Sequence, residues 1–462
     1  MLALVLLALL VAPLAAAQGG SSARLRVEYL DSPLTIDVAT PRFSFAPLHP
    51  VRGAALASYR IVVAQTFPVA APVWDSGIVA SNSSLNVGYK GPALTSNADY
   101  SWTVTWVDNF GATSAPASST FSTGLLDAAA DWAAAEWISG AGGKLNTFRT
   151  ELTLASPVTR ARLFVTGLGY AKTYLNGALT DDHELGQFTT FQQRTLYDVV
   201  DVTAQLRVGC NALGVMLGMG WWSEPSIAAG VRQFRLVLSV TTQDGKTASF
   251  ASSNAAGGAG ALVFTAIAGP VTSDNIYDGE SFDGRIAAAL AGWSECGFAP
   301  SPAWPWQPTE APAVTPSSFG AVISAHGVLI RTDRTYSVVD SGITQPKPGV
   351  FVFDFGQNMA GQTALKVEDC PDGTVITLIH NEILNPDGTV NRNLAKMEGQ
   401  FTCAGANGVE EYRTLFTYYG EPLCRLTAMG LRPCRRSATT ASNGGGPAIT
   451  RPSSQQTRSP RT

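Results

Sequence analysis

The chain has 462 residues, of which 14% are charged, and it contains 45 glycines and 27 prolines. This length suits about three domains of ~150 residues each, and the abundance of glycine, proline and aromatic residues favours an all-β chain with many turns. The net charge of −4 gives no electrostatic footprint for nucleic acid, so a neutral ligand is the more compatible partner.

The first residues have the pattern of a secretory signal. Residues 2–11 form an uninterrupted apolar run, which is followed by Pro13 and by alanines at 15–17. This predicts a signal peptide over residues 1–17 and a secreted, extracellular protein. A membrane anchor is the alternative, but the run is shorter than the ~20 residues that a span requires. We expect no membrane association beyond this segment.

Residues 24–124 are predicted to form a β-sandwich. Strands between turn signals are expected at 25–29, 59–64 and 100–108. In the last of these, Tyr100, Trp102, Val104 and Trp106 share one face, opposite small polar residues. That alternation is typical of a strand with one side in the core. The segment resembles a fibronectin type III or immunoglobulin-like module.

After an alanine-rich segment, which predicts a short helical linker, residues 136–300 contain a second set of strands. Asn176-Gly177 predicts a tight hairpin, because both residues tolerate positive φ angles. The acid-rich exit of this hairpin includes Asp181 and Asp182. Adjacent carboxylates on a turn can supply oxygen ligands to calcium. A solvated turn without an ion is the alternative.

Two further groups in this segment are candidates for sugar binding. Trp221, Trp222 and Glu224 follow glycines at the end of a strand. Aromatic faces stack on sugar rings while a carboxylate accepts hydroxyl hydrogen bonds, although tryptophan beside glycine is also common in cores. Asp278 and Glu280 belong to a second group, a local acidic cluster. The alternative is that this cluster is structural, with Asp283 and Arg285 forming a pair that fixes the loop.

Residues 317–420 are predicted to form a third sandwich, after a proline-rich linker. Its most informative stretch is 350–361, VFVFDFGQNMAG. The strict alternation of this stretch predicts a half-buried strand with Phe351, Phe353 and Phe355 on one face. Polar residues near it, including His380 and Glu382, are interpreted as structural hydrogen-bonding groups. No motif for a nucleophile, a phosphate loop or a zinc site occurs.

The stretch 350–361, together with HNEILNPDG at 380–388 and FTYYG at 416–420, resembles the bacterial-type α-L-rhamnosidases of glycoside hydrolase family 78. The segment DNIYDGESFDGR at 274–285 is similar to a family segment as well. The resemblance implies a fibronectin-like module, a galactose-binding-like jelly roll and a concanavalin-like sandwich in series. It also implies that rhamnose-containing glycans or glycosides are the ligands, and that in some members the jelly roll binds rhamnose with calcium.

In that family the FTYYG-like segment precedes a helical barrel, which holds the acid and base of an inverting hydrolase. Here residues 421–462 hold seven arginines against one glutamate and are rich in Ser, Thr, Gly and Pro, a composition that predicts a disordered tail. We therefore expect a truncated or frame-shifted product that carries the accessory domains, has no assignable catalytic residues and is inactive. A stand-alone carbohydrate-binding protein and an adhesion or scaffold module are the alternatives.

Four of the six cysteines precede the tail. An oxidising compartment permits disulfides, and proximity along the chain favours Cys210 with Cys296 and Cys370 with Cys403. Buried free thiols are the alternative. The absence of a Cys/His cluster at ligand spacing argues against a structural zinc site.

Overall fold

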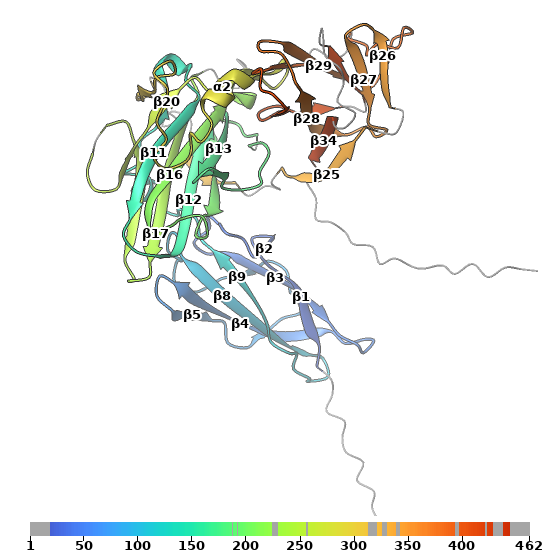
Figure 1. Ribbon diagram of the computed structural model, residues 1–462. Coiled ribbons are helices and arrows are strands. Elements are labelled where there is room, and N and C mark those ends of the chain that lie inside the picture. The colour runs from blue at the N-terminus through green and yellow to red at the C-terminus, as the bar shows by residue number, and fades with distance from the viewer. Residues whose placement is uncertain are drawn as a thin grey trace, which may run out of the picture. The chain divides into compact units, whose positions relative to one another are not determined.

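The computed structural model describes residues 19–186, 188–191, 193–223, 230–255, 257–312, 321–325, 330–338, 342–392, 397–420, 423–427 and 438–443. The chain divides into two compact units, residues 1–127 and 128–462. Figure 1 shows that both consist almost wholly of strands, and the described α-helices are α1 Ala128–Asp131 and α2 Gly284–Ala289. Among the described residues, no helix has the length and apolar character needed to span a membrane.

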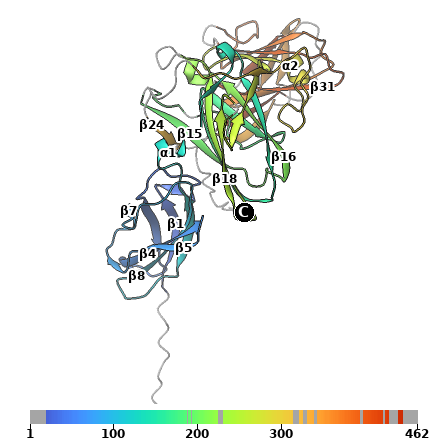
Figure 2. The ribbon, with the colours of Figure 1, turned by 90° about the vertical axis from the view of Figure 1, so that its left-hand side faces the viewer.

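The first unit is a sandwich of two antiparallel sheets (Figure 2). One sheet has the order β2-β1-β3-β7, formed by β1 Ser21–Val27, β2 Leu30–Asp31, β3 Arg42–Leu48 and β7 Val87–Gly88. The other has the order β5-β4-β8-β9 with β6 paired to β4, formed by β4 Leu56–Phe67, β5 Ala71–Asp75, β6 Val79–Ala80, β8 Asp99–Asp108 and β9 Ala117–Ser122. Tyr100, Trp102, Val104 and Trp106 are buried in the core, which confirms the predicted face of β8.

The second unit begins with a jelly roll. Its first sheet has the order β19-β18-β17-β12-β15-β24 with β10 paired to β17, formed by β10 Ile138–Ser139, β12 Val158–Leu168, β15 Arg194–Asp201, β17 Gln233–Thr242, β18 Thr247–Ser253, β19 Ala261–Val263 and β24 Ala321–Ser324. Its second sheet has the order β14-β13-β16-β11-β20-β23, formed by β11 Thr147–Leu154, β13 Tyr170–Leu175, β14 Ala178–Leu179, β16 Gly209–Gly218, β20 Thr265–Ile267 and β23 Gln307–Pro308. The apolar residues between these sheets form one core. Asn176 and Gly177, with φ angles of 52° and 89°, form the predicted turn between β13 and β14.

The second unit also contains the predicted third sandwich. One sheet has the order β21-β22-β30-β29-β33-β27-β26, formed by β21 Val271–Asn275, β22 Gly279–Asp283, β26 Ile343–Lys347, β27 Val350–Asp354, β29 Val375–Asn381, β30 Glu398–Thr402 and β33 Leu423–Thr427. The other has the order β25-β34-β28-β31 with β32 paired to β28, formed by β25 Thr332–Ser337, β28 Ala360–Glu368, β31 Val409–Arg413, β32 Tyr419–Gly420 and β34 Ala438–Asn443. The all-β class and the three sandwiches are therefore confirmed.

Three strands cross the boundaries expected from the sequence: β24, and the antiparallel pair β21 and β22. β22, within the range assigned to the jelly roll, pairs in parallel with β30 of the third sandwich. β24, within the range assigned to the third sandwich, pairs in parallel with β15 of the jelly roll. The alternation of side chains reveals a strand but not the sheet that it joins. The two sandwiches of the second unit therefore exchange strands.

β27 differs from the half-buried strand that its alternation predicted. Phe351 and Phe353 lie in the core of the third sandwich. The opposite face is covered too, because Val352 packs against Ile379 of β29 and Val390 of the following loop. All four residues 350–353 are therefore buried. A strand covered on both faces needs apolar residues at every position, and this stretch supplies them.

Two segments of the tail that was predicted to be disordered are strands in the structure. β33 lies between β27 and β29 and pairs with both, while β34 pairs with β25 and β28. A strand with a partner on each side satisfies its backbone N–H and C=O groups, which tail composition alone does not reveal. The other residues of 421–462, like the predicted signal peptide at 1–17, lie outside the described residues.

Both pairings that proximity along the chain suggested are present as disulfides. Cys210 of β16 is joined to Cys296, and Cys370 is joined to Cys403. The first connects the jelly-roll sheet to the segment after α2, and the second connects the turn after β28 to the end of β30. The free-thiol alternative is therefore wrong for all four cysteines.

Candidate functional site

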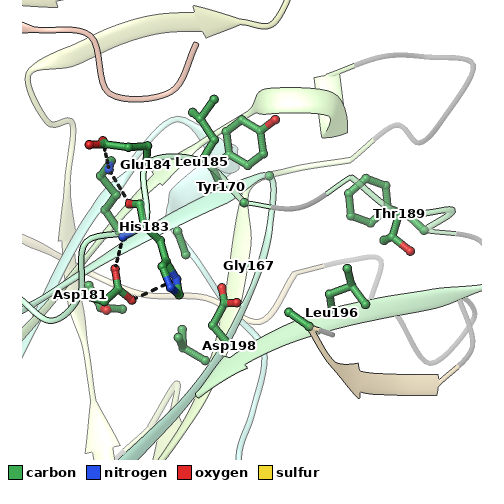
Figure 3. Close-up of a pocket in the computed structure, with 17 residues that line it drawn as sticks. Gly167, Tyr170, Asp181, His183, Glu184, Leu185, Thr189, Leu196 and Asp198 are labelled. Carbon is green, nitrogen blue, oxygen red and sulfur yellow. Dashed lines mark hydrogen bonds and ion pairs between the residues drawn. The ribbon is translucent and has the colours of Figure 1, made fainter. Parts of the chain in front are cut away.

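The acid-rich loop after β14 borders a cavity of about 50 Å³ in the jelly roll (Figure 3). β13 and β15 form its walls together with this loop. Its ionisable lining residues are Lys172, Asp181, His183, Glu184 and Asp198. The loop is shaped locally by Asp181, whose carboxylate accepts a hydrogen bond from the backbone N–H of His183. Side chains that are close in sequence therefore point into one space.

Charges around this cavity are paired. The His183 ring lies between Asp181 and Asp198 in Figure 3, and its Nδ1 is 3.6 Å from the Asp181 carboxylate. The Lys172 ammonium lies 3.6 Å from Glu184 and donates a hydrogen bond to the backbone carbonyl of His183. Glu184 also pairs with Arg413. Burial lowers the pKa of Lys172.

Asp198 is an acid of this cavity whose pKa is raised. Burial raises its pKa to about 6, and the nearby Asp181 carboxylate raises it further while His183 acts in the opposite direction. A cavity of about 50 Å³ holds a few water molecules but is far below the ~300 Å³ of a small-molecule pocket. The cavity cannot enclose a sugar ring in this conformation.

The loop oxygens that were predicted to bind calcium do not converge. Asp182 is exposed and pairs with Arg331, with 2.7 Å between the Arg331 Nε and a carboxylate oxygen. Arg331 also lies 3.3 Å from the His183 Nε2. Calcium needs six to eight oxygen ligands, and here one of the two carboxylates faces a guanidinium group instead. The residues therefore do not fit the ion as they lie, and calcium at this loop stays a prediction.

One group elsewhere in the described part of the chain has ligand atoms close enough for a metal. It consists of Glu151, Cys210 and Cys296. The two cysteines form a disulfide, so their sulfur atoms are not available as thiolates. This group therefore offers a single carboxylate and is not a metal site.

Three aromatic side chains form a half-exposed row in the second unit. Trp221 lies edge to face between Phe188 and Tyr277, with ring centroids 5.3 and 5.5 Å away. Phe188 is 56% exposed and Tyr277 is 53% exposed. We call these three residues the aromatic row. Asp278 is exposed beside Tyr277, so the structure unites two of the candidate groups predicted from the sequence.

Two predicted sugar-binding residues are in the wrong place for that role. Trp222 is fully buried, its indole N–H donates to the carbonyl of Val231, and its ring packs on Phe191. Glu280 is 1% exposed and accepts hydrogen bonds from the backbone. Neither side chain can reach a ligand, because both are buried in the core. Glu224 lies outside the described residues.

Glu280 has a structural role instead. Its carboxylate accepts hydrogen bonds from the Tyr412 hydroxyl at 3.0 Å and from the N–H groups of Leu415 and Phe416 at 3.1 and 2.8 Å. Burial raises its pKa to about 7, although these hydrogen bonds act in the opposite direction. Asp283 caps α2 and pairs with Arg285, as the structural interpretation of this loop predicted.

The polar residues of the third sandwich are also structural. His380 is buried, stacks on Tyr419 at 3.8 Å and hydrogen-bonds Thr363, and burial lowers its pKa to about 3. Glu382 accepts a hydrogen bond from the Asn358 side chain. A neutral, enclosed imidazole separated from solvent is unsuited to acid-base work on a bound substrate.

Sequence reasoning missed three residues of this site: Lys172, Asp198 and Phe188. Lys172 and Asp198 lie on separate strands, β13 and β15, so only the fold brings them to the acidic loop. Phe188 is an ordinary apolar residue in the sequence, and no local pattern distinguishes it. The charged residues within otherwise apolar strands were the one signal that could have marked Lys172 and Asp198.

The fold defines a multidomain β-sandwich protein with an immunoglobulin-like module, a jelly roll and a further sandwich. Three domain families match in this order. Residues 22–127 match the Rha78A-like N-terminal immunoglobulin domain, residues 156–325 the alpha-L-rhamnosidase N-terminal domain, and residues 344–440 the bacterial alpha-L-rhamnosidase concanavalin-like domain.

Comparison with individual known proteins points to the same family. An alpha-L-rhamnosidase from Streptomyces avermitilis is 31% identical over 67% of this chain and 30% of its own length, and one from Formosa agariphila is 26% identical over 87% and 45%. The solved structure of an alpha-L-rhamnosidase from Dictyoglumus thermophilum is 26% identical, with a TM-score of 0.83 over 93% of this chain and 49% of that one. The S. avermitilis enzyme, solved with L-rhamnose, shares the fold at 21% identity, with a TM-score of 0.80 over 92% of this chain and 57% of that one.

The chain belongs to the bacterial α-L-rhamnosidase family, glycoside hydrolase family 78. It spans between about a third and a half of the length of the curated relatives that it matches. Its described domains are the β-sandwiches of that family.

Proposed function

We propose that this chain supplies the non-catalytic β-domains of a secreted α-L-rhamnosidase, an enzyme that hydrolyses terminal α-L-rhamnosides. The observation that carries the proposal is the match of three rhamnosidase domain families, in order, to most of the chain. The rhamnose complex of the S. avermitilis relative supports rhamnosides as the ligand class. The apolar run and alanines at the start of the sequence support secretion.

The described carboxylates do not provide the chemistry of an inverting glycosidase. Such an enzyme needs an acid and a base about 6.5–9.5 Å apart across an enclosed glycosidic bond. Asp181, Glu184 and Asp198 share a cavity, but its volume of about 50 Å³ excludes a pyranose ring. Glu184 is further neutralised by Lys172 and Arg413. The polypeptide of 462 residues is therefore proposed to be inactive by itself.

The test is an assay of the purified 462-residue polypeptide with a chromogenic α-L-rhamnoside. We expect no release of the chromophore above the uncatalysed rate, because the acids that lie together among the described residues line a cavity too small for the substrate. A D. thermophilum-type full-length relative serves as the positive control. Turnover that co-purifies with the polypeptide and is lost in Asp198→Asn would overturn the proposed inactivity and place an acid in the jelly roll.

A second candidate function is that of a carbohydrate-binding protein, and the aromatic row favours it. Trp221 and Tyr277 present aromatic surface to solvent beside the exposed Asp278, which is the combination that stacks on a sugar and accepts its hydroxyl hydrogen bonds. Calorimetry of the whole chain with L-rhamnose, with and without calcium, tests it. The heat that the aromatic row contributes should be lost in Trp221→Ala, and calcium dependence would assign the acidic loop as well.

A further inference from the structure

A second cavity, of about 350 Å³, lies within the second unit and shares no lining residue with the acidic loop's cavity. Strands β13, β16 and β22 form its walls, together with α2, the turn after α2 and the segment after β31. Its apolar lining residues are Tyr174, Met216, Phe282, Leu290, Trp293 and Leu415. This volume lies at the lower end of the range for small-molecule sites, so it suits one ring rather than an oligosaccharide.

Aromatic side chains shape two sides of this cavity. Tyr174 of β13 and Trp293 of the turn after α2 are edge to face, with ring centroids 5.2 Å apart. Arg149 fixes this turn, because its Nε donates to the carbonyl of Trp293 at 2.9 Å. The disulfide of Cys296 holds the same turn against β16. The aromatic walls are therefore preorganised, which reduces the entropy cost of binding.

Three polar groups of the cavity have no hydrogen-bond partner within the part of the chain that the structure describes. They are the Tyr174 hydroxyl, the Trp293 indole N–H and the Glu295 carboxylate. Arg413 also lines the cavity, but its guanidinium is held by Glu184, Thr332 and Gln362. The lining thus offers two donors and one strong acceptor, while the charge of the Arg413 guanidinium is already balanced by Glu184.

We propose that this cavity binds a neutral monosaccharide. A pyranose ring has an apolar C–H face, which packs on an aromatic side chain, and hydroxyl groups around its edge that donate to a carboxylate. Trp293 and Tyr174 provide the aromatic surface, and Glu295 provides the acceptor. An anionic ligand would meet the Glu295 charge without a free cation to balance it, and a purely apolar ligand would leave the three polar groups unpaired.

This inference goes beyond the proposed function, because it assigns a ligand to a cavity separate from both the acidic loop and the aromatic row. The proposed function would stand if the cavity proved empty, since it rests on the domain matches. Conversely, the cavity could bind a sugar even if the protein had no role in rhamnoside hydrolysis. An experiment can therefore contradict one proposal without contradicting the other.

The test is isothermal titration calorimetry of the whole 462-residue chain with L-rhamnose, L-fucose and D-mannose in turn. We expect at least one sugar to bind once per chain, with a dissociation constant on the order of 1 mM. Glu295→Ala should weaken that binding by about tenfold or more, and Trp293→Phe should weaken it by less because an aromatic face remains. Glu295 is exposed, so its removal leaves the fold intact.

Two matched variants make the result specific. Glu368→Ala removes an exposed carboxylate of the third sandwich and should leave the affinity unchanged. Trp221→Ala removes the centre of the aromatic row, so heat that is lost in this variant would belong to the row and not to the cavity. Sugar heat that is lost in Trp221→Ala but kept in Glu295→Ala would overturn the assignment in favour of the aromatic row. The absence of heat with all three sugars would overturn it too.

Discussion

The Glu280 carboxylate is buried and accepts hydrogen bonds from the Tyr412 hydroxyl and from the N–H groups of Leu415 and Phe416. These bonds attach β22 to the segment that follows β31. The segment containing Glu280 looked like a ligand loop in the sequence because three carboxylates lie within six residues. Because Glu280 is buried and its pKa is raised, its protonation affects the stability of the fold and makes that stability depend on pH.

Glu280 and His380 should influence stability in opposite directions. The pKa of Glu280 is raised from 4.5 to about 7, so the unfolded chain releases this proton at lower pH and stability falls as the pH rises from 4.5 to 7. The pKa of His380 is lowered from 6.5 to about 3, so the unfolded chain binds this proton first and stability falls as the pH drops from 6.5 to 3. The two effects oppose each other between pH 4.5 and 6.5.

Glu280→Gln should remove one of these effects. The amide keeps a carbonyl oxygen for the backbone N–H groups but carries no titrating proton. Relative to the unmodified chain, the unfolding free energy of this variant should rise by about 3 kcal/mol between pH 4.5 and 7. Urea unfolding at several pH values measures it, with the exposed Glu368→Gln as the control. Parallel pH profiles for the variant and the unmodified chain would show that Glu280 titrates normally.

At the scale of elements, the two disulfides act on chain segments of different length. Cys210 and Cys296 are 86 residues apart, and Cys370 and Cys403 are 33 residues apart. Closing a longer loop removes more entropy from the unfolded chain. The loop-closure model gives about 4.6 kcal/mol for the first bridge and about 3.7 kcal/mol for the second.

Replacing both cysteines of a bridge by alanine should therefore destabilise the second unit, and by more for the 210/296 pair than for the 370/403 pair. Denaturant unfolding of the two double variants measures the difference. Each double variant carries the same two Cys→Ala changes, so the two variants differ only in which bridge is removed and each serves as the control for the other. A larger loss for the 370/403 pair would mean that native packing, and not loop length, decides the contribution.

The sequence predicted local elements better than it predicted their partners. The alternating aromatic face of β8 and the Asn176-Gly177 turn depend on side-chain spacing and φ preference, which are local properties. The pairing of β22 with β30, the insertion of β33 between β27 and β29, and the burial of Trp222 depend on residues far away in the sequence. The same limit applies to the site, where Asp181 was found from its neighbours but Asp198 and Lys172 required the fold.

At the scale of the whole molecule, the second unit contains two sandwiches that share strands. β24 extends the jelly-roll sheet through β15, and β22 extends the third sandwich through β30. The Glu280 hydrogen bonds and the contact of Phe416 with Tyr170 and Met216 in one apolar cluster add to this connection. Because the two sandwiches share strands, we expect them to unfold as a single cooperative unit, although sequence families treat them as separate domains.

A fragment of residues 136–300, which matches the jelly roll as predicted from the sequence, should therefore fold poorly. It lacks β24 and β30, leaves the edge of β15 open, and removes every hydrogen-bond partner of the buried Glu280 carboxylate. A fragment of residues 128–443 retains all of these contacts and should unfold cooperatively.

Circular dichroism on heating, together with size-exclusion chromatography, distinguishes the two fragments. Residues 19–127 provide a fragment of the separate first unit as a control for expression and handling. If 136–300 is monomeric and melts cooperatively at the same temperature as 128–443, then the exchanged strands do not couple the sandwiches, and the jelly roll is an independent domain.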